Sequence, residues 1–489
     1  MNNYLIILPI ILPLALGYAS QFIKFENDEK RATYSIICTT INSVIVFASL
    51  LLMRGTSVNI INFTDTLNIT FKIDGLGCVF AAMVSFLWPL ATIYASEYMK
   101  HEGKMLKFFC FYLMTFGVTI GLAFSANMLT MYLCYEALTF ITLPLVMHSM
   151  DKRAEYAGKK YLIYSVGGAS LSFVGMMIVL FYNHSLDFTY GGIVTVQNTP
   201  ILIAYLLMFI GFGVKAAIFP LHGWLPGASV APTTVTALLH AVAVVKAGVF
   251  AIMRTTFYLF GTDVVKGTLV QTVVMTIAII TICFGSWSAV KSRHLKRRLA
   301  YSTVSQLAYI VFGITLMTTD GFKGSMSHML FHAFIKIVLF YTAGAILYTN
   351  HKEYVDDLEG YAKKMPKTFA LFTICSIALI GIPPLPGFLS KYTLATAAFR
   401  EASMTNIFPF IGVCALMFSA FMTAIYLLEI ITMAYFPSKD FDMKSLDHVK
   451  EAPSRLLIPM AIITVLMVSI TFWATPLFNI LETVAKGGF

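Results

Sequence analysis

The amino-acid sequence predicts an all-α polytopic membrane protein. Its 489 residues are 58% hydrophobic and only 12% charged, whereas soluble domains carry about 25% charged residues. Apolar runs of about 20 residues, the length that spans a bilayer as a helix, recur from one end of the chain to the other. No linker or shift in composition interrupts them, so we expect residues 1–489 to form a single integral membrane domain.

About fourteen apolar segments are expected to be transmembrane helices. The first has no basic region before it and no convincing cleavage site after it, so we interpret it as a retained helix rather than a signal peptide. Between the second and third, SVNIINFTDTLNITFKID (57–74) alternates apolar and polar residues, which predicts a small exposed β-hairpin. The predicted spans are 4–22, 35–53, 76–96, 108–124, 127–148, 161–182, 201–221, 234–259, 269–290, 301–318, 325–348, 369–399, 407–435 and 456–478.

The basic residues orient this layout. If the spans alternate in direction, the loops on one side carry about three times as many Lys and Arg as those on the other, and the positive-inside rule assigns the richer side to the cytoplasm. Both termini are then expected on the outer face of the cell membrane. Arg254, near the outer end of its span, is counted with the outer loops. The formal net charge of +10 follows mostly from this bias and requires no nucleic-acid partner.

Cysteine and glycine patterns offer no cofactor site. The seven cysteines stand singly in apolar segments, without the CxxC or Cys/His spacing of an iron–sulfur cluster or a zinc site. The sequence also lacks a glycine-rich phosphate loop and a dinucleotide-binding fingerprint. We therefore expect no cofactor and no metal ion in this chain, and any redox or ATP chemistry in another subunit.

Six ionisable side chains remain inside the predicted spans. A charge near the centre of a membrane helix costs about 2.5–3.5 kcal/mol, so such groups are expected to face a hydrated interior and to act as a relay. The alternative of snorkelling lysines and capping acids fits poorly, because Lys246 and Lys336 lie near the middle of their spans. His328 and His332 precede Lys336 at four-residue spacing, so all three share one helix face. The six are Glu136, Lys215, Lys246, Lys336, Lys391 and Glu429.

Two spans contain a proline cluster beside a lysine. Residues 211–227 read GFGVKAAIFPLHGWLPG, and residues 381–392 read GIPPLPGFLSKY. Proline removes a backbone donor and clashes with the preceding turn, which frees carbonyls that water or protein must satisfy. The breaks fall five spans apart, and an odd offset reverses direction across the membrane. Spans four to eight (about 108–259) and nine to thirteen (about 269–435) are therefore expected to form inverted five-helix repeats, each with a broken helix.

Several stretches resemble the antiporter-like subunits shared by respiratory complex I, membrane-bound group 4 hydrogenases and Mrp-type multisubunit cation/proton antiporters. The resemblance covers essentially the whole chain. It implies an ion-translocating subunit that assembles with other membrane subunits, including further antiporter-like ones. The stretches are LCYEALTF (133–140), VKAAIFPLHGWLPGASVAPTTVTALLHAVAVVKAG (214–248), LKRRLAYSTVSQLAYI (295–310), HMLFHAFIKIVLF (328–340) and GIPPLPGFLSKY (381–392).

The resemblance also implies roles for individual residues. Glu136 matches a buried glutamate that pairs with the broken-helix lysine, here Lys215. A carboxylate about 4 Å from an ammonium stabilises it by roughly 4 kcal/mol, so opening the pair would release a proton. Glu429 has no role that a motif assigns. Lys246, with His240 nearby, matches the relay group of the eighth span. The residues His328, His332 and Lys336 match the central histidine–lysine helix. Lys391 matches the residue that exchanges a proton with the outer aqueous side.

Three functions stay open. The first is translocation of protons, or of sodium, by a subunit of a redox-driven complex of the complex I or hydrogenase type. The second is the D-type subunit of an Mrp-type sodium/proton antiporter without a redox partner, which uses the same machinery. The third, a stand-alone solute permease or an inert scaffold, is disfavoured by the continuous row of charges. The sequence alone does not separate the first two.

Overall fold

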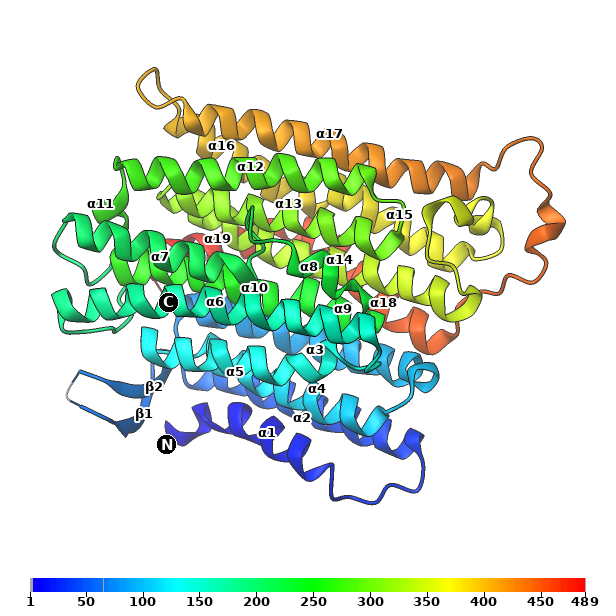
Figure 1. The fold of residues 1–489 in the computed structure, drawn as a ribbon, viewed down its shortest axis with the longest axis horizontal. Coiled ribbons are helices and arrows are strands. Elements are labelled where there is room, and N and C mark those ends of the chain that lie inside the picture. Colours follow the sequence, from blue (N-terminus) through cyan, green and yellow to red (C-terminus); the bar gives the residue numbers. More distant parts are fainter. Residues whose placement is uncertain (1–2, 65, 489) are drawn as a thin grey trace.

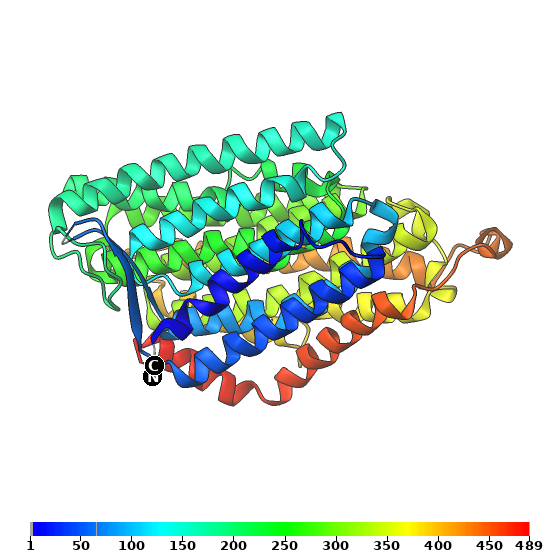
Figure 2. The same cartoon turned by 90° about the horizontal axis from the view of Figure 1, so that it is seen from below.

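The computed structural model describes residues 3–64 and 66–488 and is mostly helical. The helices pack side by side as one bundle with roughly parallel axes (Figure 1). Both chain ends and the hairpin lie at one end of this bundle. The loop between α17 (Phe408–Tyr435) and α18 (Ser454–Phe472) lies at the other end, as a second view confirms (Figure 2).

Ten helices among the described residues are long and apolar enough to cross a membrane, so the multi-span architecture is confirmed. Polar side chains between the apolar runs cap several of these helices and so determine where they begin. Asn127, for example, accepts a hydrogen bond from the amide of Thr130 at 2.8 Å and caps the helix that follows. The ten are α2 (Asp28–Leu52), α3 (Gly75–Glu102), α4 (Met105–Ala123), α5 (Met128–Val146), α6 (Lys152–Asn183), the segment Thr233–Phe260, α12 (Leu269–Lys291), α14 (Thr319–Asn350), α17 and α18.

Further helices complete the bundle. Three are apolar but shorter: α1 (Leu8–Ala19), α7 (Thr199–Lys215) and α15 (Pro366–Ile380). The helix α13 (Leu295–Thr315) begins with three basic residues in its first turn and lies beside α12 and α14. The remaining α-helices among the described residues are α8 (Trp224–Gly227), α9 (Thr233–Ala237), α10 (Val244–Arg254), α11 (Thr262–Val265), α16 (Pro386–Glu401) and α19 (Ala474–Ala485).

The predicted hairpin is confirmed as a two-stranded antiparallel sheet. Strand β1 (Ser57–Asn62) pairs with β2 (Asn68–Lys72), with Ser57 opposite Lys72 and Asn62 opposite Asn68. Residue 65, in its turn, lies outside the described residues. Strand β1 is mostly exposed, whereas Phe71 of β2 is buried against the helices. The hairpin therefore covers one end of the bundle rather than any part of its interior.

At both predicted breaks the chain leaves helical geometry close to a lysine. Helix α7 ends at Lys215, and the next helical turn begins only at Trp224. The indole N–H of Trp224 donates to the carbonyl of Val214 at 2.7 Å, so it satisfies one carbonyl near the interruption. Similarly, α15 ends at Ile380 and α16 begins at Pro386. The proline clusters thus interrupt helices inside the bundle, where a polar side chain finds free carbonyls.

Helix α14 lies in the interior of the bundle. It packs against α3, α13, α15, α16, α18 and α19, and nearly all its side chains from Gly321 to Ile346 are buried. The face that carries His328, His332 and Lys336 therefore meets other helices and not lipid. This placement brings the histidine–lysine row into contact with groups from distant parts of the chain.

Candidate functional site

Lys215 is fully buried and bonds to the backbone of α5. Its ammonium donates to the carbonyl of Tyr135 and lies 3.4 Å from the centroid of the Tyr135 ring. Glu136, the next residue, is half-buried, and its Oε1 has no hydrogen-bond partner in the described part of the chain. Among the described residues no ion pair joins Glu136 to Lys215. The expected carboxylate–ammonium contact is replaced here by a lysine–carbonyl bond one residue away.

Lys246 connects α10 to α14. It is fully buried, and its Nζ lies 2.7 Å from Nδ1 of His332. Since an ammonium only donates, a charged lysine requires Nδ1 of a neutral imidazole as the acceptor here, whereas a neutral amine can either donate to this nitrogen or accept from it. The other ring nitrogen of His332 has no partner in residues 3–64 and 66–488. The pair is therefore a direct contact across which one proton can be shared.

Lys336, one turn further along α14, bonds to α13. Its Nζ donates to Oγ of Ser302 at 2.7 Å and to the carbonyl of Leu299 at 3.1 Å. It is fully buried, and the structure shows no carboxylate within ion-pair distance of it in the described chain. The hydrogen-bond partners of this amine are therefore neutral oxygens of α13.

His240 occupies the turn between α9 and α10, where the chain adopts π-helical geometry over residues 238–242. Its ring is fully buried, with its centroid 4.8 Å from that of Phe340 on α14. Neither ring nitrogen has a hydrogen-bond partner among the described residues. Buried polar atoms of this kind are ordinarily satisfied by water, so a water molecule would be stabilised beside this ring.

His328 and Lys391 meet at the second break. Nδ1 of His328 lies 2.9 Å from Oγ of Ser390, and its ring stacks on Tyr309 at a centroid distance of 5.3 Å. Lys391 lies 5.3 Å from the same Tyr309 ring and donates to the carbonyls of Leu379 and Ile380 at 2.6 and 3.0 Å. The lysine thus caps the last carbonyls of α15, where the helix dipole also favours a positive charge.

The predicted residues form separate contacts along one axis rather than an unbroken chain of hydrogen bonds. The direct links are Lys246 to His332 and the shared ring of Tyr309 between His328 and Lys391. His328 and His332 lie one turn apart with ring centroids separated by 6.1 Å. Unpartnered polar atoms of Glu136, His240, His328 and His332 mark the gaps between contacts within the described chain. Water molecules at these atoms would complete a relay.

Two buried arginines escaped the sequence analysis. Arg254, which was counted with the outer loops, is fully buried on α10 and forms a bidentate ion pair with Asp74 ahead of α3. Arg298, expected in a cytoplasmic loop, is also fully buried and pairs with Glu429 at 2.7 Å. Both lie near helix ends, where hydropathy places a charge outside the membrane. The acidic partners were visible in the sequence, but their partnership was not.

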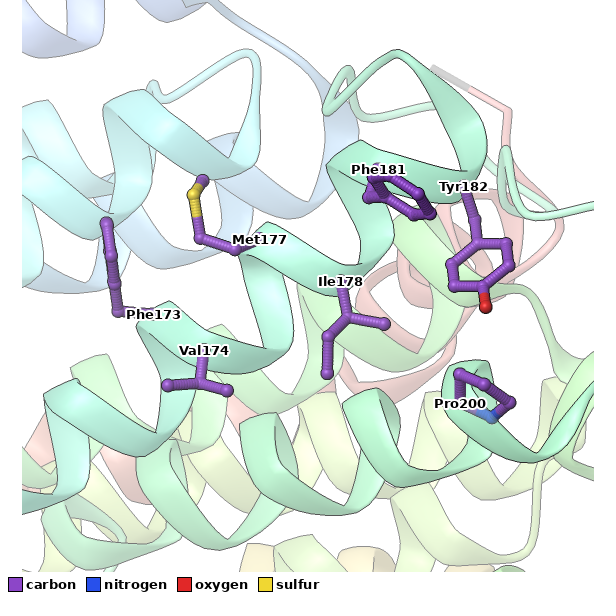
Figure 3. Close-up of a pocket in the computed structure, with 7 residues that line it drawn as sticks. All are labelled: Phe173, Val174, Met177, Ile178, Phe181, Tyr182 and Pro200. Carbon is purple, nitrogen blue, oxygen red and sulfur yellow. The ribbon is translucent and has the colours of Figure 1, made fainter.

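One surface hollow, by contrast, has the character of a lipid contact. A hollow of about 480 Å³ between α6 and α7 is lined by apolar side chains from Phe173 to Tyr182 and by Pro200 (Figure 3). It carries no charged group and suits contact with lipid. Within residues 3–64 and 66–488, no three His, Cys, Asp or Glu side chains gather closely enough to hold a metal ion.

Comparison with protein families gives two matches. Residues 125–438 match the family described as NADH:quinone oxidoreductase/Mrp antiporter, TM. Residues 61–109 match NADH-Ubiquinone oxidoreductase (complex I), chain 5 N-terminus. The first match covers more than half of the chain and contains all eight residues that the sequence analysis assigned to ion translocation.

Individual relatives come from two kinds of complex. The chain is 29% identical over 488 residues to NADH-quinone oxidoreductase subunit L of Rickettsia bellii. This alignment covers 95% of this chain and 73% of that protein. The chain is 30% identical over 400 residues to Na(+)/H(+) antiporter subunit A1 of Staphylococcus aureus, which covers 76% of this chain. That match covers 49% of the antiporter subunit, so this chain corresponds to about half of it.

Two solved structures share the fold. A chain of the membrane-bound sulfane sulfur reductase (MBS), an archaeal respiratory membrane complex, superposes with a TM-score of 0.85 at 22% identity, over 99% of this chain and 96% of that one. A chain of the Mrp complex from Dietzia sp. DQ12-45-1b gives a TM-score of 0.85 at 18% identity, over 99% and 97%. The relatives and structural neighbours belong to membrane complexes of several subunits.

Proposed function

Because this chain belongs to the NADH:quinone oxidoreductase/Mrp antiporter transmembrane family, we propose that it translocates protons across the cell membrane as the antiporter-like subunit of a redox-driven complex. The observation that carries the proposal is the buried contact between Lys246 and His332. It joins α10 to α14, the helix that carries the histidine–lysine row, in the interior of the bundle. Other membrane subunits, including further antiporter-like ones, are its proposed partners.

The proposed path begins at Glu136 and Lys215 and ends at Lys391. Lys215 sits at the end of α7, close to carbonyls freed by the first break, and exchanges its bond to Tyr135 for one to Glu136. Each exchange changes the stability of the ammonium by roughly 4 kcal/mol at 4 Å and an effective dielectric near 20. That energy is large enough to move a proton on or off the lysine. Water near His240 passes the proton to the Lys246–His332 contact.

From this contact the proton moves along α14. Lys336 and His328 lie on the same face as His332, one turn to either side. His328 shares the Tyr309 ring with Lys391, which lies at the second break and is only half-buried. Lys391 is therefore the proposed exchange point with the outer aqueous side.

The same proposal includes the finer architecture. Fourteen spans would form a single domain, with residues 108–259 and 269–435 as inverted repeats. The two helix breaks beside Lys215 and Lys391 support this symmetry. Both termini lie at the end of the bundle that carries the hairpin, which supports a common outer location given the basic loops at the other end (Figure 1).

A second candidate is a subunit of an Mrp-type sodium/proton antiporter without a redox partner. The identity of 30% to an Na(+)/H(+) antiporter subunit and the shared fold of the Mrp complex favour it. Purification of the assembled complex separates the two, because a redox-driven complex contains iron–sulfur subunits and an antiporter does not. Electron-donor-dependent proton uptake by vesicles would assign the first function.

Replacement of Glu136 and Lys215 tests the path. Glu136→Gln and Lys215→Ala should each abolish or strongly reduce ion translocation in sealed vesicles, because either change removes one charge of the switch. The amount of assembled complex should stay close to wild type. Normal pumping by both variants would show that the switch assignment is wrong.

A further inference from the structure

A polar seam lies between α13 and α17. Oγ of Ser305 lies 2.9 Å from Oγ of Ser419, and Oγ of Ser302 lies 2.5 Å from the hydroxyl of Tyr426. Along each helix the polar residues recur every three or four positions, so each set forms one face. The two faces point toward each other inside the membrane region. We define the seam by Arg298, Ser302 and Ser305 of α13 and by Ser419, Thr423, Tyr426 and Glu429 of α17.

The middle of the seam contacts the central relay helix α14. Lys336 of α14 donates to Ser302 at 2.7 Å, and Ser302 contacts the Tyr426 hydroxyl, where either oxygen can be the donor. The Tyr426 hydroxyl also bonds Oγ1 of Thr423 at 3.3 Å. All four side chains are buried. A short hydroxyl chain therefore starts at Lys336 and leads away from the row of histidines.

The end of the seam at Arg298 and Glu429 is accessible to solvent. Glu429 is 33% exposed, and its two oxygens accept from Arg298 at 2.7 Å and from Arg293 at 2.6 Å. Arg293 is 56% exposed and lines a polar cavity of about 680 Å³ beside the loop between α12 and α13. Nη2 of Arg298 is buried without a partner in the described chain, and a buried donor of this kind calls for water. The partly exposed carboxylate of Glu429 therefore connects Arg298 to solvent at this end of the bundle.

We propose that this seam is the route by which Lys336 receives protons from the cytoplasm, an inference that rests on the proposed function. The neutral amine of Lys336 takes the hydroxyl proton of Ser302. The Ser302 oxygen takes the proton of Tyr426, the Tyr426 oxygen takes one from a water molecule on the Glu429 side, and that water regains its proton from the cytoplasmic solution. One proton enters for each one delivered, and both hydroxyls are restored.

The charges at the mouth fit this route. Glu429 attracts protons from the cytoplasmic water, and Arg298 holds the carboxylate beside the seam. A guanidinium stays charged at any working pH, so Arg298 repels metal cations. A proton still passes, because it moves by exchange between hydroxyl groups and no cation has to cross. Ser302 and Tyr426 are the relay residues, and Arg298 is a positioning residue.

The test compares variants of the assembled complex in inverted vesicles, whose outer bath faces the cytoplasmic side. Tyr426→Phe removes one hydroxyl and keeps the ring. Ser302→Ala removes the other, and Ser302→Val also fills the space that a water molecule would take. Tyr205→Phe is the matched control, since Tyr205 is equally buried and its hydroxyl contacts that of Thr256 at 3.0 Å, outside the seam.

Tyr426→Phe and Ser302→Val should slow proton transport by roughly tenfold or more, within the range of a lost proton-transfer group. Tyr205→Phe should change it by less than about twofold. In the seam variants, reprotonation of Lys336 then limits turnover. Acidifying the outer bath should therefore restore much of their transport rate, and it should change the rate of the wild type little. A merely structural role for the two hydroxyls predicts no such recovery.

The outcomes separate this inference from the proposed function. Wild-type transport in Tyr426→Phe and Ser302→Val, with Glu136→Gln inactive, rejects the seam and leaves the proposed function standing. An equal loss in Tyr205→Phe, or a loss that acidification does not relieve, also rejects the seam. Normal transport in Glu136→Gln and Lys215→Ala rejects both, because Lys336 would then have no relay to supply.

Discussion

Gly387, in the first turn of α16, offers a direct test of the second helix break. A Cβ at this position would lie 1.8 Å from the carbonyl oxygen of Ala378 in α15, whereas ordinary contact begins at 3.4 Å. Both atoms belong to backbone or are fixed to it, so neither can rotate away. In Gly387→Ala the two halves of the broken helix must therefore separate by about 1.6 Å.

This separation acts on Lys391. Its Nζ lies 2.6 Å from the carbonyl of Leu379 and 3.0 Å from that of Ile380. A shift of α16 by the required amount stretches both contacts beyond the roughly 3.2 Å limit of an N–H···O bond. Overpacking of this kind costs about 1–3 kcal/mol, which an assembled bundle tolerates. A misplacement of about 1 Å at a reacting group lowers rates by about 100-fold, so we expect proton transport to fall between about tenfold and 100-fold.

The assay is proton uptake by inverted vesicles at matched amounts of assembled complex. Gly167→Ala in α6 is the control, because a Cβ there has no neighbour within 4 Å. It should assemble and transport like the wild type. If Gly387→Ala, once assembled, transports as fast as Gly167→Ala, then close contact between α15 and α16 is not needed to position Lys391, and the reasoning fails.

Two further predictions address Lys391 and the orientation. Lys391→Arg and Lys391→Met should lose most proton transport, because a guanidinium does not release its proton and methionine has none. Lys391→Glu should keep part of it, because a carboxyl group titrates. Transport assays on all three variants test this order, and an active Lys391→Arg variant would contradict the assignment of Lys391 as the exit residue. Cysteines placed at Ser292 and Ser438 should react only with reagents admitted to the cytoplasm, and one at Thr262 only from outside, since the loop after α17 and helix α11 lie at opposite ends of the bundle (Figure 1). Equal labelling of Ser292 and Thr262 from one side would overturn this orientation.

The sequence by itself determined the membrane class, the hairpin, the positions of the two breaks and the identity of the family. Each of these depends on local properties: the length of an apolar run, the alternation between β1 and β2, or a proline that cannot donate a hydrogen bond. The shared face of His328, His332 and Lys336 also follows from helical spacing alone. The structure keeps all three on the buried α14.

Only the tertiary structure decided which groups meet. Lys246 and His332 are 86 positions apart, and their contact depends on how the segment that contains α10 lies beside α14. Lys215 bonds the carbonyl of Tyr135 rather than the Glu136 carboxylate, although both belong to the same turn of α5. Such choices follow from side-chain directions across a helix interface, which no local pattern encodes.

The buried arginines show the same limit at the membrane boundary. Hydropathy assigns a charge near a helix end to water, because it weighs each segment without its neighbours. Arg254 and Arg298 are buried nonetheless, since Asp74 and Glu429 approach them from other helices and offset the cost of removing the guanidinium from water. A charge is stable inside the bundle only when a distant segment supplies its partner, so the location of these groups is a property of the folded chain.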